Sequence, residues 1–257
     1  MRRLWWRRTG MFILSFGTFL LAWKIASTYF VSRHIIPPPD EVLRTALPML
    51  LSGEIARHTA ASLARVAVGF SMGSALGVLV GVFMGRIRWV HDLLDPVIEF
   101  FRFLSPTAMI PIAVIWFGIG ETSKYFLIFW GSFFVILINT IHGVMATPDI
   151  RLRAAECLGA TRLQTFTRIV LPSAVPSVTT GMRVALALSY MSIIPAEILA
   201  ADSGLGYLLQ QSSLLLQTNR VFVVLAVFGV LGGVSDWLFR AISTRLLGRY
   251  LDVAQSH

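Results

Sequence analysis

Residues 153–159 read RAAECLG and residues 169–172 read IVLP, in a stretch that separates two long apolar runs of the chain. Two alanines, a glycine, an isoleucine and a Leu-Pro pair form one long, gapped pattern. A helix that ends at a glycine turn, followed by a second short helix, would present this pattern as a compact protrusion. A simple membrane anchor has no need of such a protrusion. We therefore predict a docking surface for a cytoplasmic partner, whose movement could move the spans on either side.

The composition indicates a membrane protein. Of 257 residues, 56% are hydrophobic and 14% are charged, and the mean hydropathy is +0.73. In soluble domains about a quarter of the residues are charged, so the excess apolar surface of this chain is expected to face lipid. The net charge of +9 is spread in short clusters between apolar runs, which argues against nucleic-acid binding. The one cysteine, Cys157, excludes an internal disulfide and a thiolate metal cluster.

Six apolar stretches are long enough to cross a bilayer, which needs about 20 residues. They are residues 11–31, 60–85, 93–117, 121–146, 173–200 and 219–247. The third stretch is expected to break near Ser105-Pro106, because proline removes a backbone donor and crowds the preceding turn. The first stretch is interpreted as an uncleaved anchor, since its apolar run is too long for a signal peptide.

The basic residues predict the orientation. If the amino terminus lies inside, the inner segments hold thirteen arginines, and the outer segments hold Arg33, Arg44, Arg57, Lys124 and Arg220. This bias follows the positive-inside rule. Both termini and the loop at 147–172 are therefore predicted to be cytoplasmic.

The chain divides into four predicted regions. Residues 1–31 hold the cytoplasmic amino terminus and the first span, 32–58 an external segment, 59–247 a five-helix core with the loop 147–172, and 248–257 a cytoplasmic tail. In the external segment, Asp40 is predicted to be the N-cap of an amphipathic helix over 41–51. Its expected apolar stripe is Leu43, Leu47, Leu50 and Leu51.

Glycine recurs every four residues in the second span, at Gly69, Gly73, Gly77, Gly81 and Gly85. This spacing makes a shallow groove that allows another helix to approach closely. Two interpretations stay open. The face packs within one subunit, or it lies against a helix that slides during a working cycle.

Motifs of soluble enzymes are absent from the sequence. The two lysines, Lys24 and Lys124, do not follow glycine, so no phosphate-binding Gly-Lys-[Ser/Thr] ending exists. The five histidines form no H-x-x-x-H pair for zinc, and no G-x-S-x-G elbow occurs. We expect a non-enzymatic chain without a metal or cofactor of its own, whose energy comes from another chain.

Ionisable and polar residues inside spans are costly and suggest function. Lys24 and Arg65 lie near the outer ends of their spans and are expected to snorkel. Glu99 and Arg102 are three residues apart and can pair with each other. The predicted candidates for a translocation path are Glu99, Arg102, Asn139, Arg183 and Glu197. Helix-to-helix polar ties are the alternative for each of them.

The 154–172 pattern resembles the EAA loop of permease subunits of ATP-binding-cassette importers. Ala154-Ala155, Gly159, Ile169 and Leu171-Pro172 fall at the spacing of that loop, whereas Arg153 stands where the family usually has glutamate. Residues 62–65 (SLAR), 116–124 (WFGIGETSK), 196–197 (AE) and 204–206 (GLG) resemble the branch that handles nitrate, sulfonates, taurine and bicarbonate. The predicted coupling residues are Arg153, Ala154, Ala155, Glu156, Gly159, Ala160, Ile169, Leu171 and Pro172.

The resemblance implies an all-α membrane protein with six transmembrane helices, like a type I importer permease, in the bacterial inner membrane. It implies a permease homodimer surrounded by lipid, two ATPase subunits that bind ATP and Mg²⁺, and an external solute-binding protein. The expected function is import of a small, anionic solute by alternating access. A secondary transporter or channel is the alternative, although such a protein usually shows matched repeat halves, which this sequence lacks. An intramembrane enzyme is a weaker alternative, with His142 near Asn139 as its best constellation.

Overall fold

A computed structural model describes residues 2–30, 32 and 34–251, and these residues form helices and connecting turns without a β-strand. The predicted tail beyond residue 251, the end of the first span at residue 31 and Arg33 lie outside the described residues. The helices are α1 (Arg2–Ile25), α2 (Pro39–Leu51), α3 (Glu54–Arg86), α4 (Arg88–Arg102), α5 (Ile110–Phe117), α6 (Glu121–Met145), α7 (Asp149–Cys157), α8 (Arg162–Thr165), α9 (Leu171–Ala200), α10 (Leu205–Leu214) and α11 (Thr218–Leu251). Two π-helical turns, η1 (Ala26–Phe30) and η2 (Phe166–Val170), extend α1 and join α8 to α9.

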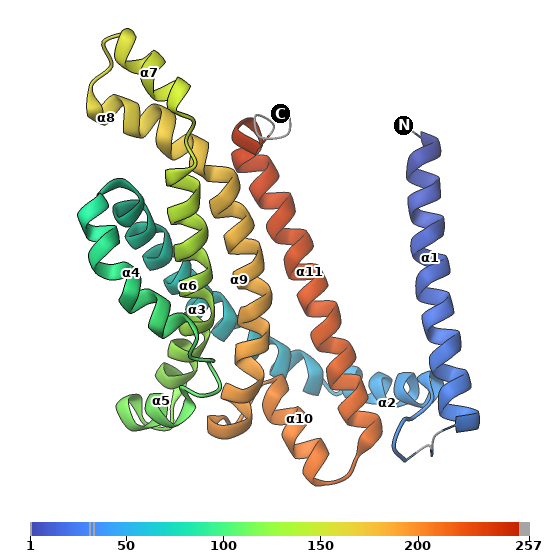
Figure 1. The fold of residues 1–257 in the computed structure, drawn as a ribbon. Helices are drawn as coiled ribbons and strands as arrows, with labels where there is room; N and C mark the ends of the chain where they lie inside the picture. Colours follow the sequence, from blue (N-terminus) through green and yellow to red (C-terminus); the bar gives the residue numbers. More distant parts are fainter. Residues whose placement is uncertain (1, 31, 33, 252–257) are drawn as a thin grey trace.

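Four helical stretches are long and apolar enough to cross a membrane. They are Glu54–Arg86, Glu121–Met145, Arg162–Leu199 and Thr218–Gly248. In Figure 1, α6, α9 and α11 lie side by side and α3 crosses obliquely behind them, with α7 and α8 at one end of the molecule and α5 and α10 at the other. The start of α1 and the end of α11 lie toward the α7–α8 end. Following the predicted orientation, we call this end inner and the opposite end outer.

The centre of the bundle is the contact between α3 and α6, where the five glycines of α3 face α6. A Cβ atom added at Gly69, Gly77, Gly81 or Gly85 would lie within 3.1 Å of an α6 side chain. The α6 side chains that face these glycines form a ridge and also recur every four residues. They are Ile128, Ser132, Ile136, Thr140 and Val144. The glycine groove therefore receives a ridge of α6 from the same chain, and short distances between backbones follow.

The third predicted span is broken, as the proline signal indicated. Helix α4 ends at Arg102, α5 begins at Ile110, and Ser105 and Pro106 lie in the turn between them. The break exposes backbone carbonyl groups, which need new partners inside an apolar layer. The Nε1 atom of Trp130 on α6 donates a hydrogen bond to the carbonyl oxygen of Leu104 at 2.9 Å. The helix starts at Arg88, five residues before the predicted boundary at 93.

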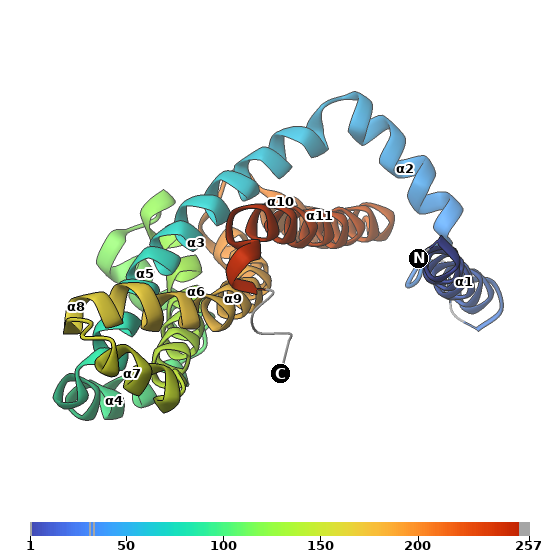
Figure 2. The same cartoon turned by 90° about the horizontal axis from the view of Figure 1, so that it is seen from above.

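The first predicted span, α1 with η1, stands apart from the main bundle and joins it through α2 (Figure 2). Trp23 stacks on Phe222 of α11 with ring centroids 5.7 Å apart. Lys24, expected to snorkel, forms an ion pair with Asp40 at 3.4 Å. Neither the described part of α1 nor the α4–α5 pair meets the criterion that the four longer stretches meet. The count of six spans therefore stays a prediction for these two.

The external helix differs from the prediction at its start. Helix α2 begins at Pro39, with Pro38 as the N-cap residue, and Asp40 lies in the first turn, so the predicted N-cap is wrong. The fixed φ of Pro39 favours the first helical position, which explains the earlier start. Val42 and Met49 are buried, whereas the predicted stripe of Leu43, Leu47, Leu50 and Leu51 is exposed. This stripe is thus available to lipid.

We predict that Gly81→Ala destabilises the protein because its Cβ would lie 2.6 Å from the Cβ of Thr140 and 2.9 Å from the carbonyl oxygen of Leu137. Overpacking of this kind costs about 1–3 kcal/mol. The apparent melting temperature of the detergent-solubilised protein should fall. The control is Gly229→Ala in α11, where nothing lies within 4 Å. Equal melting temperatures for the two variants would contradict the proposed packing.

Candidate functional site

The inner protrusion consists of α7, a glycine turn and α8. The amide of Ala160 donates to the carbonyl oxygen of Ala155, and that of Gly159 donates to Glu156, both at 3.0 Å. Gly159 has φ of +74°. This pair of bonds with a left-handed residue is the Schellman ending of a helix, for which glycine is favoured. The predicted order of helix, glycine turn and short helix is confirmed.

Helix α8 begins with its own cap. The Thr161 hydroxyl accepts from the amide of Gln164, and the Gln164 side chain accepts from the amide of Thr161. This reciprocal capping box satisfies amides that the first turn leaves free. From Arg162 the helical stretch continues without interruption through η2 and α9 to Leu199. The second arm of the protrusion is therefore one end of a membrane-spanning helix.

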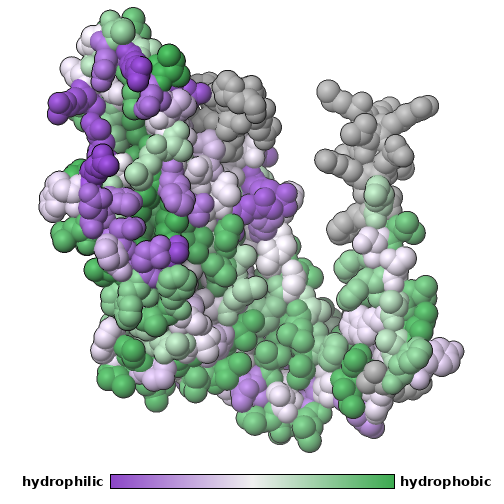
Figure 3. Space-filling model, viewed as in Figure 1, coloured by the Kyte–Doolittle hydropathy of each residue, from purple (hydrophilic) through white to green (hydrophobic). Residues whose placement is uncertain are grey.

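One side of the protrusion is attached to the bundle and the other is free. Val170 packs with Val144 and Ala174, Phe166 packs against this cluster, and Arg86 lies over the Phe166 ring at 5.7 Å. Leu158 and Leu163 at the tip are 87% and 71% exposed. Hydrophilic residues gather around this end of the molecule (Figure 3). Such a mixture of exposed leucines and charges suits a protein contact.

The nine predicted coupling residues divide between these two sides. Ala155 is buried, and the residues of intermediate exposure are Ala160, Ile169, Leu171 and Pro172. The exposed residues are Arg153, Ala154, Glu156 and Gly159. The less exposed residues of the motif thus attach the protrusion to the helical bundle, and the exposed residues face away from the bundle.

A second site lies near the outer end, where a buried cluster of charges joins three helices. Arg65 of α3 is 4% exposed, Lys124 of α6 is 4% exposed and Glu197 of α9 is fully buried. Glu121, whose side chain is 47% exposed, completes the cluster at the start of α6. Two cations thus face two carboxylates, so the cluster is electrically balanced. The expectation that Arg65 snorkels is wrong, because its side chain turns inward to these partners.

Arg65 uses every donor of its guanidinium group. Nε and Nη2 each donate to a carboxylate oxygen of Glu121 at 2.7 Å. Nη1 donates to Glu197 at 2.7 Å and to the carbonyl oxygen of Ser203 at 2.5 Å, and Nη2 also reaches the Ser203 hydroxyl at 3.2 Å. Guanidinium carries five N–H donors, so this buried group has no unsatisfied donor.

Glu197 is held from several directions. Besides Arg65, its carboxylate accepts from the Ser62 hydroxyl at 2.8 Å and from the amide of Gly206 at 2.8 Å. A Cβ at Gly206 would lie 2.7 Å from the carbonyl oxygen of Ile194, and Gly204 has φ of +118°. Glycine at both positions therefore permits the backbone to approach the carboxylate. The segments 62–65, 121–124 and 197–206 meet here, although each is remote in sequence.

The other predicted path residues do not form one group. Glu99 and Arg102 on α4 pair with each other at 3.0 Å, as their spacing suggested. Asn139 on α6 donates to the carbonyl oxygen of Val135 at 2.8 Å and lies against Gly181. Arg183 on α9 binds Asp236 of α11 at 2.5 Å, and Arg240 binds the same carboxylate at 2.7 Å. Asn139, Arg183 and Glu197 thus all have hydrogen-bond or ion-pair partners within this chain. The sequence analysis did not identify Asp236 as the partner of Arg183.

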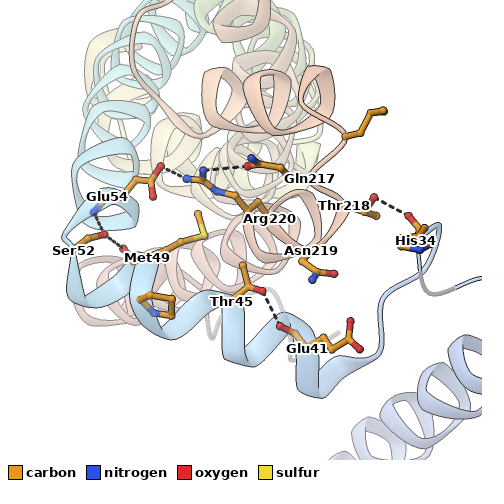
Figure 4. Close-up of a pocket in the computed structure, with 12 residues that line it drawn as sticks. His34, Glu41, Thr45, Met49, Ser52, Glu54, Gln217, Thr218, Asn219 and Arg220 are labelled. Carbon is orange, nitrogen blue, oxygen red and sulfur yellow. Dashed lines mark hydrogen bonds and ion pairs between the residues drawn. The ribbon is translucent and has the colours of Figure 1, made fainter.

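A hollow of about 830 Å³ opens at the outer end between α2 and the turn that precedes α11 (Figure 4). Thr218 donates to the carbonyl oxygen of His34 at 2.8 Å, Arg220 pairs with Glu54, and Arg220 also reaches Gln217 at 3.2 Å. Leu216 on the rim has φ of +56° and is 87% exposed. These contacts hold the external segment against the turn between α10 and α11.

We predict that Asp236→Asn lowers the yield of folded protein because Arg183, within a span, loses its counter-ion. An ionised side chain without a partner is costly inside a membrane, so removing one partner of the pair should cost more than removing both. The double variant Arg183→Gln with Asp236→Asn should therefore recover part of the yield, measured by fluorescence-detected size-exclusion chromatography. Arg240→Gln, which leaves the Arg183 pair intact, is the control. Equal yields for the single and double variants would contradict the explanation that an unpaired Arg183 causes the loss.

Comparison with known proteins gives a family that fits this geometry. The family described as binding-protein-dependent transport system inner membrane component matches residues 73–248. The taurine transport system permease protein TauC of Escherichia coli (strain K12) is 35% identical over 256 residues, which cover 95% of this chain and 93% of TauC.

Two further relatives are named for other solutes. The putative aliphatic sulfonates transport permease protein SsuC of Escherichia coli (strain K12) is 35% identical over 246 residues, covering 95% of this chain and 91% of SsuC. The bicarbonate transport system permease protein CmpB of Synechococcus elongatus is 32% identical over 240 residues, covering 87% of this chain and 86% of CmpB.

A solved structure supports the fold. An inward-facing form of the MetNI methionine ABC transporter superposes with a TM-score of 0.63 at 20% sequence identity, covering 79% of this chain and 98% of the matched chain. At this identity the likeness concerns the fold alone.

Proposed function

This chain belongs to the family of binding-protein-dependent transport system inner membrane components, and we propose that it forms the translocation path for a small, anionic solute. It is a multi-pass protein of the inner membrane and a non-enzymatic subunit of an ATP-driven importer, whose ATPase is a separate subunit. An importer of this family also takes its solute from a binding protein.

The observation that carries the proposal is the continuity of the protrusion with a spanning helix. The helical stretch Arg162–Leu199 begins at the exposed tip and ends beside the buried charge cluster. A partner that displaces the tip therefore displaces a helix of the path. In the proposed cycle, two ATPase subunits bind ATP and Mg²⁺, close, and carry the docked protrusions with them.

Alternating access follows from this coupling. Two copies of the chain, surrounded by lipid, enclose the path at their interface, and the external binding protein delivers the solute at the outer end. ATP-driven closure opens the path outward, and hydrolysis resets it. A partner can shift such an equilibrium only by its different affinity for the two states, so the exposed face of the protrusion must contact the ATPases differently before and after closure.

The solute class is inferred from the relatives. The names of three relatives give taurine, aliphatic sulfonates and bicarbonate as the solutes of those proteins. Sulfonates and bicarbonate are small oxyanions, and taurine also carries a sulfonate group. We therefore assign a small oxyanion, with sulfonates including taurine first, to the path of this chain.

Reconstitution tests the function. The chain is co-expressed with its partner ATPase, reconstituted into proteoliposomes with the binding protein, and assayed for ATP-dependent uptake of radiolabelled taurine. Competition by ethanesulfonate, nitrate and bicarbonate then ranks the solutes. Uptake without the ATPase subunits would favour a secondary transporter or channel instead. ATP-dependent uptake that only a cationic solute inhibits would contradict the oxyanion assignment.

We predict that Gly159→Val uncouples transport from ATP hydrolysis. Gly159 has φ of +74°, which a β-branched residue rarely adopts, so the turn between α7 and α8 must change its shape. Taurine uptake per ATP hydrolysed should fall several-fold, while the amount of membrane-inserted protein stays the same. The matched control is Gly118→Val, where φ is +73° and nothing lies within 4 Å, outside the protrusion. Normal coupling in the Gly159 variant would count against the protrusion as the coupling element.

A further inference from the structure

The helical stretch Arg162–Leu199 joins the two sites described above. At a rise of 1.5 Å per residue its 38 residues span roughly 57 Å. Its inner end is an arm of the protrusion, and Glu197 lies near its outer end. A movement imposed on one end of a packed helix is carried to the other end, where the charge cluster holds it.

The cluster attaches this outer end to the start of α10. Helix α10 has no side-chain cap of its own, because its N-cap residue is Gly204. Its first amides are instead bound by side chains of α3 and α9. Gly204 donates to Nδ1 of His58 at 3.0 Å, Leu205 to the Ser62 hydroxyl at 2.8 Å and Gly206 to Glu197 at 2.8 Å. Since free amides at a helix start need partners, these side chains act as a tertiary cap.

The charges make this attachment difficult to break. The carboxylate of Glu197 lies at the amino-terminal end of α10, where a negative charge is favoured by the helix dipole. Arg65 holds Glu197 and the Ser203 carbonyl oxygen with the same nitrogen, Nη1. Separating the start of α10 from the cluster would leave the amides of Gly204, Leu205 and Gly206 without their acceptors and Arg65 without Ser203. Buried polar groups that lose their hydrogen bonds are unfavourable.

We propose that Arg65 and Glu197 are positioning residues that fasten α10 to the outer end of α9, so that the α9 movement driven by the ATPases carries α10 with it. The inference rests on the proposed function, because it needs a nucleotide-driven movement of α9. Helix α10 leads to exposed leucines at positions 214–216, of which Leu216 lines the outer hollow. Its movement would reshape the outer surface at the place where a solute enters.

Thiol labelling tests the proposal. In the reconstituted importer, Cys157→Ser removes the single cysteine, and Leu214→Cys or Leu199→Cys then reports on α10 or α9, respectively. Both leucines are exposed. The rate of reaction with a membrane-impermeant maleimide is compared without nucleotide and after trapping with ATP and vanadate. We expect a several-fold change of rate at both positions with the cluster intact.

Glu197→Gln should separate the two reporters. The amide keeps the shape of the side chain but removes the charge that binds Arg65 and two further donors. The rate at position 199 should still depend on nucleotide, whereas the dependence at position 214 should disappear. Asp202→Asn, an equal loss of charge at an exposed residue of the same turn, is the matched control and should leave both dependences intact.

Arg65→Lys provides a second test if Glu197→Gln fails to assemble. Lysine keeps the positive charge but cannot bridge Glu121, Glu197 and Ser203 as the guanidinium fork does. Assembly is followed by the amount of ATPase that co-purifies. A retained dependence at position 214 in either assembled variant would overturn the proposal, as would the absence of any dependence there in the unaltered cluster. Gly159→Val separates the two levels of failure: if it uncouples transport while Glu197→Gln changes nothing, the attachment is wrong and the proposed function stands.

Discussion

The ion pair between Arg65 and Glu197 is the interaction on which the outer half of the molecule depends. Its atoms lie 2.7 Å apart in surroundings where Glu197 has no exposed surface. A charge in such a place is costly unless it is paired and fully hydrogen-bonded. The other contacts of the cluster meet this requirement. Glu121 and Ser203 accept the remaining hydrogen bonds of the guanidinium group, while the Ser62 hydroxyl and the Gly206 amide donate hydrogen bonds to the carboxylate of Glu197. As a result, α3, α6, α9 and the start of α10 meet at one point.

The centre of the bundle is organised by a different constraint, which is close packing. The glycines of α3 accept the β-branched and serine side chains of α6, and α6 in turn packs against α9. Helix α9 is therefore packed along its length, with an arm of the protrusion at one end and the charge cluster at the other. The chain thus combines a rigid centre with an exposed protrusion that a partner can grip. Under the proposed function, this arrangement would let a subunit without an ATP-binding motif respond to ATP that is bound by a partner subunit.

The local features of the fold were predictable from the sequence. Gly159 ends α7 because the Schellman geometry needs a left-handed residue, and Pro106 interrupts the third span because its ring cannot continue the helix. The prediction for Asp40 failed because two signals compete within three residues, and Pro39 starts the helix first. The recurrence of glycine predicted a close-packing face, but the sequence could not name the helix that would occupy it.

The candidate site shows where sequence reasoning ends. The sequence by itself determined four of the long apolar helices, the break in the third predicted span and the shape of the protrusion. Backbone conformation, side-chain period and apolar length, on which these features depend, act over a few neighbouring residues. Only the tertiary structure decided that Arg65 turns inward. Its partner Glu197 lies 132 residues away, and the energy of burying a charge depends on whether folding brings such a partner within hydrogen-bonding distance. The pair of Arg183 and Asp236 could not be predicted for the same reason, because the two residues are remote in sequence and only folding brings them together.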